Sequence, residues 1–144
     1  MLVSQILKSK GSEGVVTVQP GLSVSQAAEV LSQKKIGALV ISKDGKTLGG
    51  IVSERDIVRE VGRRGPDCLN DSVASIMTAK VVTCHLAEQT DAVLQKMTDG
   101  RFRHIPVVEG GQLVGLISIG DVVKARLTEL AMEKDALEGM IKGF

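Results

Sequence analysis

Two copies of one short frame carry the residue types that could do chemistry in this chain. The frame reads GIVSERD at residues 50–56 and GLISIGD at residues 115–121, so glycine, serine and aspartate recur 65 positions apart. Serine followed three residues later by an acidic residue, ahead of an apolar run, is typical of a capping box, which satisfies free amides at a helix start. The free amides and the positive end of the helix dipole would also hold an anion. The frame therefore predicts either a helix cap alone or a cap that also cradles a ligand.

The glycines of the frame favour the cradle. Each lies three residues before the serine, and a position without a side chain permits close approach to the backbone. The first candidate binding residues are therefore Gly50, Ser53 and Asp56 in the first copy and Gly115, Ser118 and Asp121 in the second.

The two frames lie inside a longer duplication. Residues 15–41 match residues 81–107 at an offset of 66, and a turn one residue shorter then changes the offset to 65. β-branched runs bounded by turn residues predict strands at 15–18, 38–41 and 48–52 in the first copy and at 81–84, 105–108 and 113–117 in the second. Helical apolar spacing follows the first and last strand of each copy, so each copy is expected to run strand, helix, strand, strand, helix.

The order of these elements predicts the α+β fold class. Two strands of each copy form a hairpin, with Asp44 and Gly45 or Gly110 and Gly111 as turn residues. Hairpins mixed with crossover helices are typical of α+β folds, and a sheet of three strands rarely stands alone. We therefore expect the copies to pack against each other as a pseudo-twofold pair. The chain divides into a first repeat at 1–68, a second repeat at 69–128 and a C-terminal helical extension at 129–144.

The segment 122–144 predicts a helix that continues beyond the second copy. A stripe interrupted by Lys134 recurs at helical spacing, on a helix of about 20 residues or roughly 30 Å. Its residues are Val123, Leu127, Leu130, Leu137 and Met140 or Ile141. An apolar stripe of this length is expected to be covered by protein. Packing against a second copy of the chain predicts a homodimer, and folding back onto its own sheet is the alternative.

Composition narrows the function classes. The chain of 144 residues carries 18 Lys and Arg against 17 Asp and Glu, so its formal charge of +1 offers no global attraction for nucleic acid or an anionic membrane. Its two aromatic residues, both phenylalanine, are too few for a base-stacking surface. No apolar run approaches the roughly 20 residues of a membrane span, and the first residues do not read as a signal peptide. We expect a cytoplasmic protein that binds neither nucleic acid nor membrane.

Catalytic and metal-binding motifs are missing from the sequence. The GKT stretch at 45–47 lies in a predicted hairpin turn and lacks the earlier glycine of a phosphate loop. Neither histidine stands at a recognised spacing from a nucleophile. Cys84 and His85 are neighbours on a predicted strand, where successive side chains face opposite sides, so they cannot share a metal ion. We expect no catalytic residue, no catalytic cofactor and no metal site.

The duplicated unit resembles the cystathionine β-synthase (CBS) domain pair, also called a Bateman module. The resemblance rests on the strand, helix, strand, strand, helix order and on the frames at 50–56 and 115–121, and it covers nearly the whole chain. It is similar to the small stand-alone bacterial pairs of this family. The resemblance implies a protein that binds an adenine nucleotide, with AMP, ADP, ATP, NAD(H) and S-adenosylmethionine all open as ligands.

The resemblance also implies roles for six residues. The aspartates of the frames would take the two ribose hydroxyls, which suits a carboxylate because it accepts both hydrogens. The serines would lie near ribose and phosphate, and a threonine in each first strand marks where backbone groups would contact adenine. These residues are Asp56 and Asp121, Ser53 and Ser118, and Thr17 and Thr83.

Positive charge for phosphates is concentrated in the first frame. Arg55 and Arg59, four residues apart, share a helix face, and Arg63 and Arg64 follow them. Ordinary solvated charges are the alternative interpretation. Because the Glu54-Arg55 pair becomes Ile119-Gly120 in the second frame, we expect unequal sites, with the more highly phosphorylated or dinucleotide ligand in the first.

Further candidates come from the stretch RFRHIPV at 101–107. The resemblance implies that Arg103 contacts phosphate, and His104 and Pro106 complete the candidate set. For His104, a packed or surface histidine is the alternative. Lys8 and Lys10 could reach the same phosphates, but a flexible basic N-terminus is the interpretation that we adopt.

These features predict a non-enzymatic regulatory module. It would sense an adenine nucleotide between the copies and signal through a homodimer or an unknown protein partner. The alternative is an interaction protein that binds no ligand and whose frames are only capping boxes.

Overall fold

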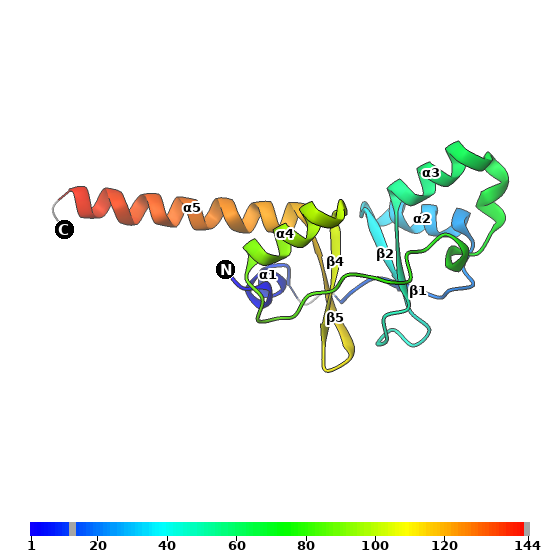
Figure 1. The fold of residues 1–144 in the computed structure, drawn as a ribbon, viewed down its shortest axis with the longest axis horizontal. Coiled ribbons are helices and arrows are strands. Elements are labelled where there is room, and N and C mark those ends of the chain that lie inside the picture. Colours follow the sequence, from blue (N-terminus) through cyan, green and yellow to red (C-terminus); the bar gives the residue numbers. More distant parts are fainter. Residues whose placement is uncertain (12–13, 143–144) are drawn as a thin grey trace.

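The structure is a computed structural model that describes residues 1–11 and 14–142, and its mixed helices and small sheets confirm the α+β class. Two halves stand side by side, each with a small sheet and its helices, and one long helix projects from the second half (Figure 1). Two short 3₁₀ turns, Pro66–Asn70 and Val73–Ser75, follow the last helix of the first half. The main elements are α1 (Val3–Ser9), β1 (Thr17–Val18), α2 (Val24–Lys34), β2 (Ala38–Ile41), β3 (Gly50–Ser53), α3 (Glu54–Arg64), α4 (Thr90–Gly100), β4 (His104–Glu109), β5 (Gln112–Ser118) and α5 (Ile119–Ile141).

Within the described residues, the first sheet has three strands and the second has two. β1 pairs in parallel with β2, and β2 pairs antiparallel with β3. β4 pairs antiparallel with β5 through a turn in which Gly110 and Gly111 have φ angles of 56° and 76°. These angles lie in the left-handed region that a two-residue hairpin turn needs and that glycine adopts without strain. Both predicted hairpins are present, although β1 and β3 each begin two residues later than expected.

The strand expected at 81–84 is wrong, because Cys84 alone forms an isolated parallel bridge to β4. Its N–H donates to Pro106 O (3.1 Å), and its carbonyl oxygen accepts from Val108 N (2.9 Å). Proline has no backbone N–H, so it cannot donate the next hydrogen bond of the ladder. At the matching position of the first copy, Val40 N donates to Val16 O (3.4 Å). One proline thus explains why the first strand of the second copy is lost.

Each of the two hydrophobic cores includes a segment that the sequence repeat would assign to the other half. The core between α4, α5 and the β4–β5 hairpin includes Val3 and Ile6 of α1. The core between α2 and the first sheet includes Val73, which lies after the end of the first copy. The expectation of a flexible basic N-terminus is therefore wrong, because the burial of Val3 and Ile6 holds α1 on the second half.

This exchange has a signature in the sequence, outside the 65-residue repeat. VSQILK at 3–8 matches VASIMT at 73–78, 70 positions apart. Val3 and Val73 are fully buried in opposite cores, and Leu7 and Met77 each cover the glycine of one frame. The division of the chain at 68 and 128 follows the sequence repeat and stays a prediction, whereas packing joins α1 to the second half and residues 73–78 to the first.

Helix α5 runs unbroken for 23 residues from Ile119 to Ile141. The last helix of the second copy and the predicted extension are therefore one helix. Its first turns pack on the second core through Val122 and Ala125, and the rest projects away from the two halves (Figure 1). Among the described residues, no helix is long and apolar enough to cross a membrane.

Candidate functional site

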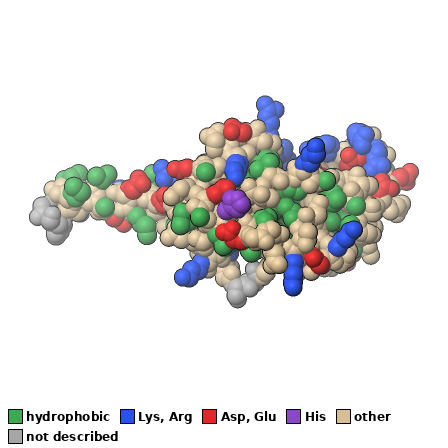
Figure 2. Space-filling model, turned by 60° about the horizontal axis from the view of Figure 1, so that its bottom comes forward, with side chains coloured by type: hydrophobic (Ala, Val, Ile, Leu, Met, Phe, Trp, Pro, Cys, Tyr) green, Lys and Arg blue, Asp and Glu red, His purple; other side chains and the backbone are tan. Residues whose placement is uncertain are grey.

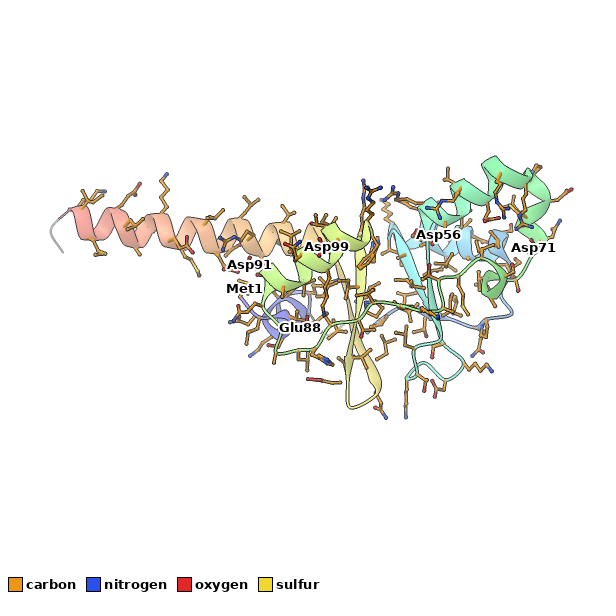
Figure 3. All side chains as sticks on the ribbon, viewed as in Figure 1. Met1, Asp56, Asp71, Glu88, Asp91 and Asp99 are labelled. Atoms are coloured by element: carbon orange, nitrogen blue, oxygen red, sulfur yellow. The ribbon has the colours of Figure 1, made fainter. Side chains whose placement is uncertain are left out.

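A cleft of about 320 Å³, which we call the first cleft, lies between the two halves at the start of α3. One wall comes from β3 and the first turns of α3, and the other comes from residues 78–82 and 100–104. Figure 3 labels Asp56 on α3, in one wall of the cleft, and Asp99 on α4, one residue before the lining segment 100–104. The volume is within the range that holds a small-molecule ligand.

The frame at 50–56 forms a capping box in the wall of the first cleft. Ser53 Oγ accepts from Asp56 N (3.2 Å), and one Asp56 carboxylate oxygen accepts from Ser53 N (2.8 Å) and Ser53 Oγ (3.0 Å). The other oxygen accepts from the Arg59 guanidinium (3.2 Å). The predicted cap is confirmed, and the Asp56 side chain is still 19% exposed, so a hydroxyl in the cleft could reach the carboxylate.

The first cleft is strongly cationic. The cations that line it are Arg55, Arg59, Lys80, Arg101 and Arg103. Among the described residues, only Arg59 of this set has an ion-pair partner, the cap aspartate. The acidic residues of the lining are Glu54 and Asp56. The surplus of positive charge suits an anion, because guanidinium and ammonium groups bind phosphate with charge-assisted hydrogen bonds.

The other two arginines of α3 serve a different purpose. Arg63 donates to Glu60 (2.9 Å), and Arg64 pairs with both Glu60 (2.7 Å) and Asp71 (2.9 Å). Neither arginine lines the first cleft. They connect α3 to the segment that follows it, so the predicted phosphate-binding face of α3 is limited to Arg55 and Arg59.

Arg101 was not among the predicted site residues, although its backbone singles it out. It is the C-cap of α4 and has a φ angle of 56°, in the left-handed region where a residue other than glycine is strained. Lys35 caps α2 with a φ angle of 54°, 66 positions earlier, and lines a second cleft. Both positions would be unstrained with glycine, yet both carry a cation. This indicates that the charge of Lys35 and Arg101 serves the clefts that they line. The sequence signal was the pair of cations at one repeat position.

The second cleft has a volume of about 400 Å³ and is built from the equivalent segments of the chain. Residues 14–16 and 35–38 take the places of 80–82 and 101–104, and β5 takes the place of β3. Ser118 Oγ accepts from Asp121 N (3.1 Å), and Ser118 N donates to the Asp121 carboxylate (2.9 Å). The second predicted cap is therefore also confirmed.

The cap aspartate of the second cleft is held by a cation from the far end of the chain. Lys10 Nζ donates to an Asp121 carboxylate oxygen (2.8 Å) and to Leu116 O (2.9 Å). Burial alone would raise the pKa of Asp121, but the Lys10 ammonium and the Ser118 amide outweigh burial and lower that pKa below its ordinary value. The carboxylate is therefore ionised and already has a counter-ion within the chain.

His104 lines both clefts. Its ring packs against the backbone of Gly37, where an added Cβ would lie 3.1 Å from the ring carbon Cε1 and 3.2 Å from Nε2. Burial lowers the pKa of His104 below 6.5, against the opposing effect of the Glu54 and Asp121 carboxylates. The side chain is therefore a packed, neutral histidine at pH 7 that also faces two candidate sites.

The glycines of the frames make room for protein atoms. A Cβ at Gly50 would collide with Met77 Sδ and lie 2.9 Å from Thr78 O, and a Cβ at Gly115 would lie 2.6 Å from a methyl carbon of Leu7. Packing of the exchanged segments thus accounts for both glycines, which corrects the interpretation that they let a ligand approach. Gly115 lines the second cleft, but Gly50 does not line the first.

Four other predicted site residues lie outside the lining of both clefts, and one of them is Asp121, although its cap partner Ser118 lines the second. Thr17 is in β1, Thr83 O accepts from Lys96 Nζ (3.0 Å), and Pro106 is buried in β4. The chain reaches the clefts slightly earlier, through Val15 and Val16 or through Val81 and Val82. These valines give each cleft an apolar wall of the kind that packs on the face of a base.

Metal binding and cysteine chemistry find little support in the part of the chain that the structure describes. No group of three or more His, Cys, Asp or Glu is placed there to hold a metal ion. Both cysteines are free and buried, and burial raises the pKa of the Cys84 thiol to about 12, with Glu88 adding to the shift. This thiol therefore stays protonated and unreactive at neutral pH.

Comparison with known proteins finds one recurring domain. The family model described as CBS domain matches residues 3–63 and 73–128. A CBS-domain-containing protein from Agrobacterium tumefaciens, of known crystal structure, is 47% identical to this chain. The two superpose with a TM-score of 0.83 over 88% of this chain and 99% of that one.

Two solved relatives contain adenosine compounds. A CBS domain protein from Pyrobaculum aerophilum complexed with AMP is 28% identical, with a TM-score of 0.78 over 92% of this chain and 99% of that one. A CBS domain pair in complex with 5′-methylthioadenosine and S-adenosyl-L-methionine is 27% identical, with a TM-score of 0.78 over 90% and 98% of the two chains.

Proposed function

The chain belongs to the CBS domain family, as a tandem pair of that domain, and from this premise we propose that it is a regulatory module that binds an adenine nucleotide between its repeats. The AMP complex and the 5′-methylthioadenosine and S-adenosyl-L-methionine complex of its relatives support an adenosine compound as ligand. The observation that carries the proposal is the first cleft, where the cap aspartate Asp56 pairs with Arg59 and lies among four further cations that have no acidic partner in the described residues.

Each part of the nucleotide has a matching group in the first cleft. The Asp56 carboxylate would accept hydrogens from the ribose hydroxyls. Val81 and Val82 would pack on adenine, and backbone groups beside them would bind its edge. Arg55 and Arg59 would bind phosphate at the N-terminus of α3, where the helix dipole also favours an anion. AMP, ADP, ATP and NAD(H) all contain these parts and are the candidate ligands.

Thermal unfolding with a panel of adenine nucleotides tests this proposal. A ligand at 100 times its Kd should stabilise the folded chain by about 2.7 kcal/mol, because the cleft exists only in the folded state. Asp56→Asn should weaken binding in the first cleft and Asp121→Asn in the second, and each should cost about 1 kcal/mol of stability or less. No stabilisation by any nucleotide at millimolar concentration would overturn the proposal and favour an interaction protein that binds no ligand.

We further propose that the module acts as a homodimer built on α5. The projecting helix has apolar side chains on its surface (Figure 2). Positions at helical spacing form a stripe that is 45% to 84% exposed, made of Val123, Leu127, Leu130, Leu137 and Ile141. In a two-fold interface the stripe of one subunit packs against the same stripe of the other, so a single apolar patch is covered in both subunits.

Two variants at positions of nearly equal exposure test the dimer. Leu127 is 63% exposed on the stripe, and Met132 is 64% exposed about half a turn away on the other face of α5. Leu127→Glu should shift light scattering from dimer to monomer at low micromolar concentration, whereas Met132→Glu should not. A dimer that survives Leu127→Glu combined with Leu137→Glu would place the interface elsewhere.

The proposed signal is a change in how the two halves are arranged. A nucleotide between the halves shifts their populations only as far as its affinities for the two arrangements differ, and an unknown protein partner would respond to that shift. The two buried free cysteines fit a reducing compartment, and we propose that the module works in the cytoplasm without catalysing a reaction.

A further inference from the structure

The two clefts are built from equivalent positions but carry different charges. The cations of the first cleft are Arg55, Arg59, Lys80, Arg101 and Arg103. The matching residues of the other copy, 65 or 66 positions away, are Gly120, Lys124, Gly14, Lys35 and Gly37 in the same order. Three cations are therefore replaced by glycine, which offers no charge and no side-chain donor.

Of the two lysines that line the second cleft, one is already paired with an acidic residue. Lys124 does not line this cleft. Lys10 lines it, but its ammonium is paired with the Asp121 carboxylate at 2.8 Å. Lys35 alone of the lining lysines has no acidic partner among the described residues. Most of the other lining is apolar, from Val15, Val16 and the strand β5.

We propose that the two clefts select different classes of adenosine compound. The first cleft takes a nucleoside di- or triphosphate or a dinucleotide, and the second takes an adenosine compound whose 5′ group carries no phosphate. Arg55 and Lys80 determine this preference in the first cleft. In the second, Gly14 of the lining and Gly120, two residues after the lining residue Ser118, leave the equivalent positions without charge. The assignment rests on the proposed function, because it assumes that adenosine binds in both clefts.

The physical basis is the difference in hydrogen bonds offered to phosphate. Each charge-assisted hydrogen bond to a phosphate oxygen raises affinity about tenfold or more. A phosphate placed against the second cleft would lose water and find mainly apolar side chains and backbone, which is unfavourable for an anion. An uncharged 5′ group carries no such penalty, so the second cleft favours it.

Exchanging the charges between the clefts tests the proposal. Arg55→Ala/Lys80→Ala removes two cations from the first cleft, and Gly14→Lys/Gly120→Arg adds two to the second. The glycine changes are sterically open with respect to the described residues: an added Cβ at Gly14 meets none of their atoms within 4 Å, and one at Gly120 meets only Ser118 Oγ at 3.7 Å. Calorimetric titration of the full chain with adenosine, AMP and ATP, without magnesium, measures each affinity. Asp56→Asn and Asp121→Asn backgrounds assign each binding event to its cleft.

In the unmodified chain we expect one site that prefers ATP over adenosine and one that prefers adenosine. Arg55→Ala/Lys80→Ala should reduce the preference of the first site for ATP about 100-fold and leave the second unchanged. Gly14→Lys/Gly120→Arg should give the second site a preference for ATP. Equal preference for ATP in both clefts, or equal loss of adenosine and ATP affinity in the first variant, would overturn the proposal. Failure of every compound to bind the unmodified chain would instead overturn the proposed function. Unfolding midpoints without ligand verify that each variant is folded.

Discussion

Asp56 and Asp121 make the same helix cap, but the counter-ion of Asp56 is close in the sequence and that of Asp121 is distant. Asp56 accepts from Arg59, one turn further along the same helix. Asp121 accepts from Lys10, which is 111 residues away in the sequence and reaches the cap because α1 packs on the second half. Duplicated local sequence thus produces two similar caps, whereas the charge around each cap depends on the distant segments that the fold brings there.

The largest effect should come from removing the local charge of the first cleft. Arg55→Ala/Arg59→Ala should weaken ATP binding about 100-fold, or about 2.7 kcal/mol, because two charge-assisted hydrogen bonds are lost, and should barely change adenosine binding. Titration calorimetry measures both. Arg63→Ala is the control, since Arg63 lies on the same helix but pairs with Glu60 outside the cleft. Equal losses for adenosine and ATP would show that these arginines do not bind phosphate.

Replacing the glycine of each frame with alanine should lower the free energy of unfolding by different amounts. Gly50→Ala forces a Cβ against Met77 and the Thr78 backbone oxygen, so we expect a loss of about 2–3 kcal/mol in the free energy of unfolding. In Gly115→Ala the three atoms nearest to the new Cβ all belong to the Leu7 side chain, which can move, so a loss of about 1 kcal/mol is expected. Urea unfolding measures both values. A larger loss at Gly115 would contradict the packing argument.

The ion pair between Lys10 and Asp121 should add a small amount to the free energy of unfolding, and acid should remove it. Because the folded-state pKa of Asp121 is lowered, its contribution is present above the ordinary value of 3.8 and is lost as the pH falls through the lowered pKa. Lys10→Met should cost about 0.5 kcal/mol at pH 7, as for an ion pair at the protein surface that solvent partly screens, and the cost should shrink below about pH 4. Urea unfolding across this pH range tests the claim, with Lys8→Met as the control on the same segment. A cost that does not change with pH would argue against the ion pair.

The smallest effect concerns the histidine that faces both clefts. Burial lowers the pKa of His104 in the folded state, so the unfolded chain binds this proton more readily. Its contribution to the free energy of unfolding should therefore be constant above about pH 6.5 and fall as the pH drops below that value. His104→Gln should remove this part of the pH dependence in thermal unfolding between pH 5 and 8, as indicated by the pKa range of histidine. Identical slopes in the two proteins would contradict the assignment.

Features that depend on neighbours within one helical turn or one hairpin could be predicted from the sequence. The caps at Ser53 and Ser118 require only an acceptor and an acidic residue three positions apart, and the structure has both. The turn at Gly110 and Gly111 requires only two residues that tolerate a positive φ angle. The repeat also predicted the α+β class, because the order of elements follows from periodicity and turns.

The parts of the site that were missed come from long-range packing. Lys80 and Arg101 reach the first cleft from the connection between the halves and from the end of α4, and no local pattern says that they meet α3 there. The segments 3–8 and 73–78 have the same apolar pattern, so each could bury the same side chains in either core. Burial of apolar surface is not directional and does not by itself choose between two equivalent partners. Only the tertiary fold decides that α1 covers the second half, and with it that Lys10 becomes the counter-ion of Asp121.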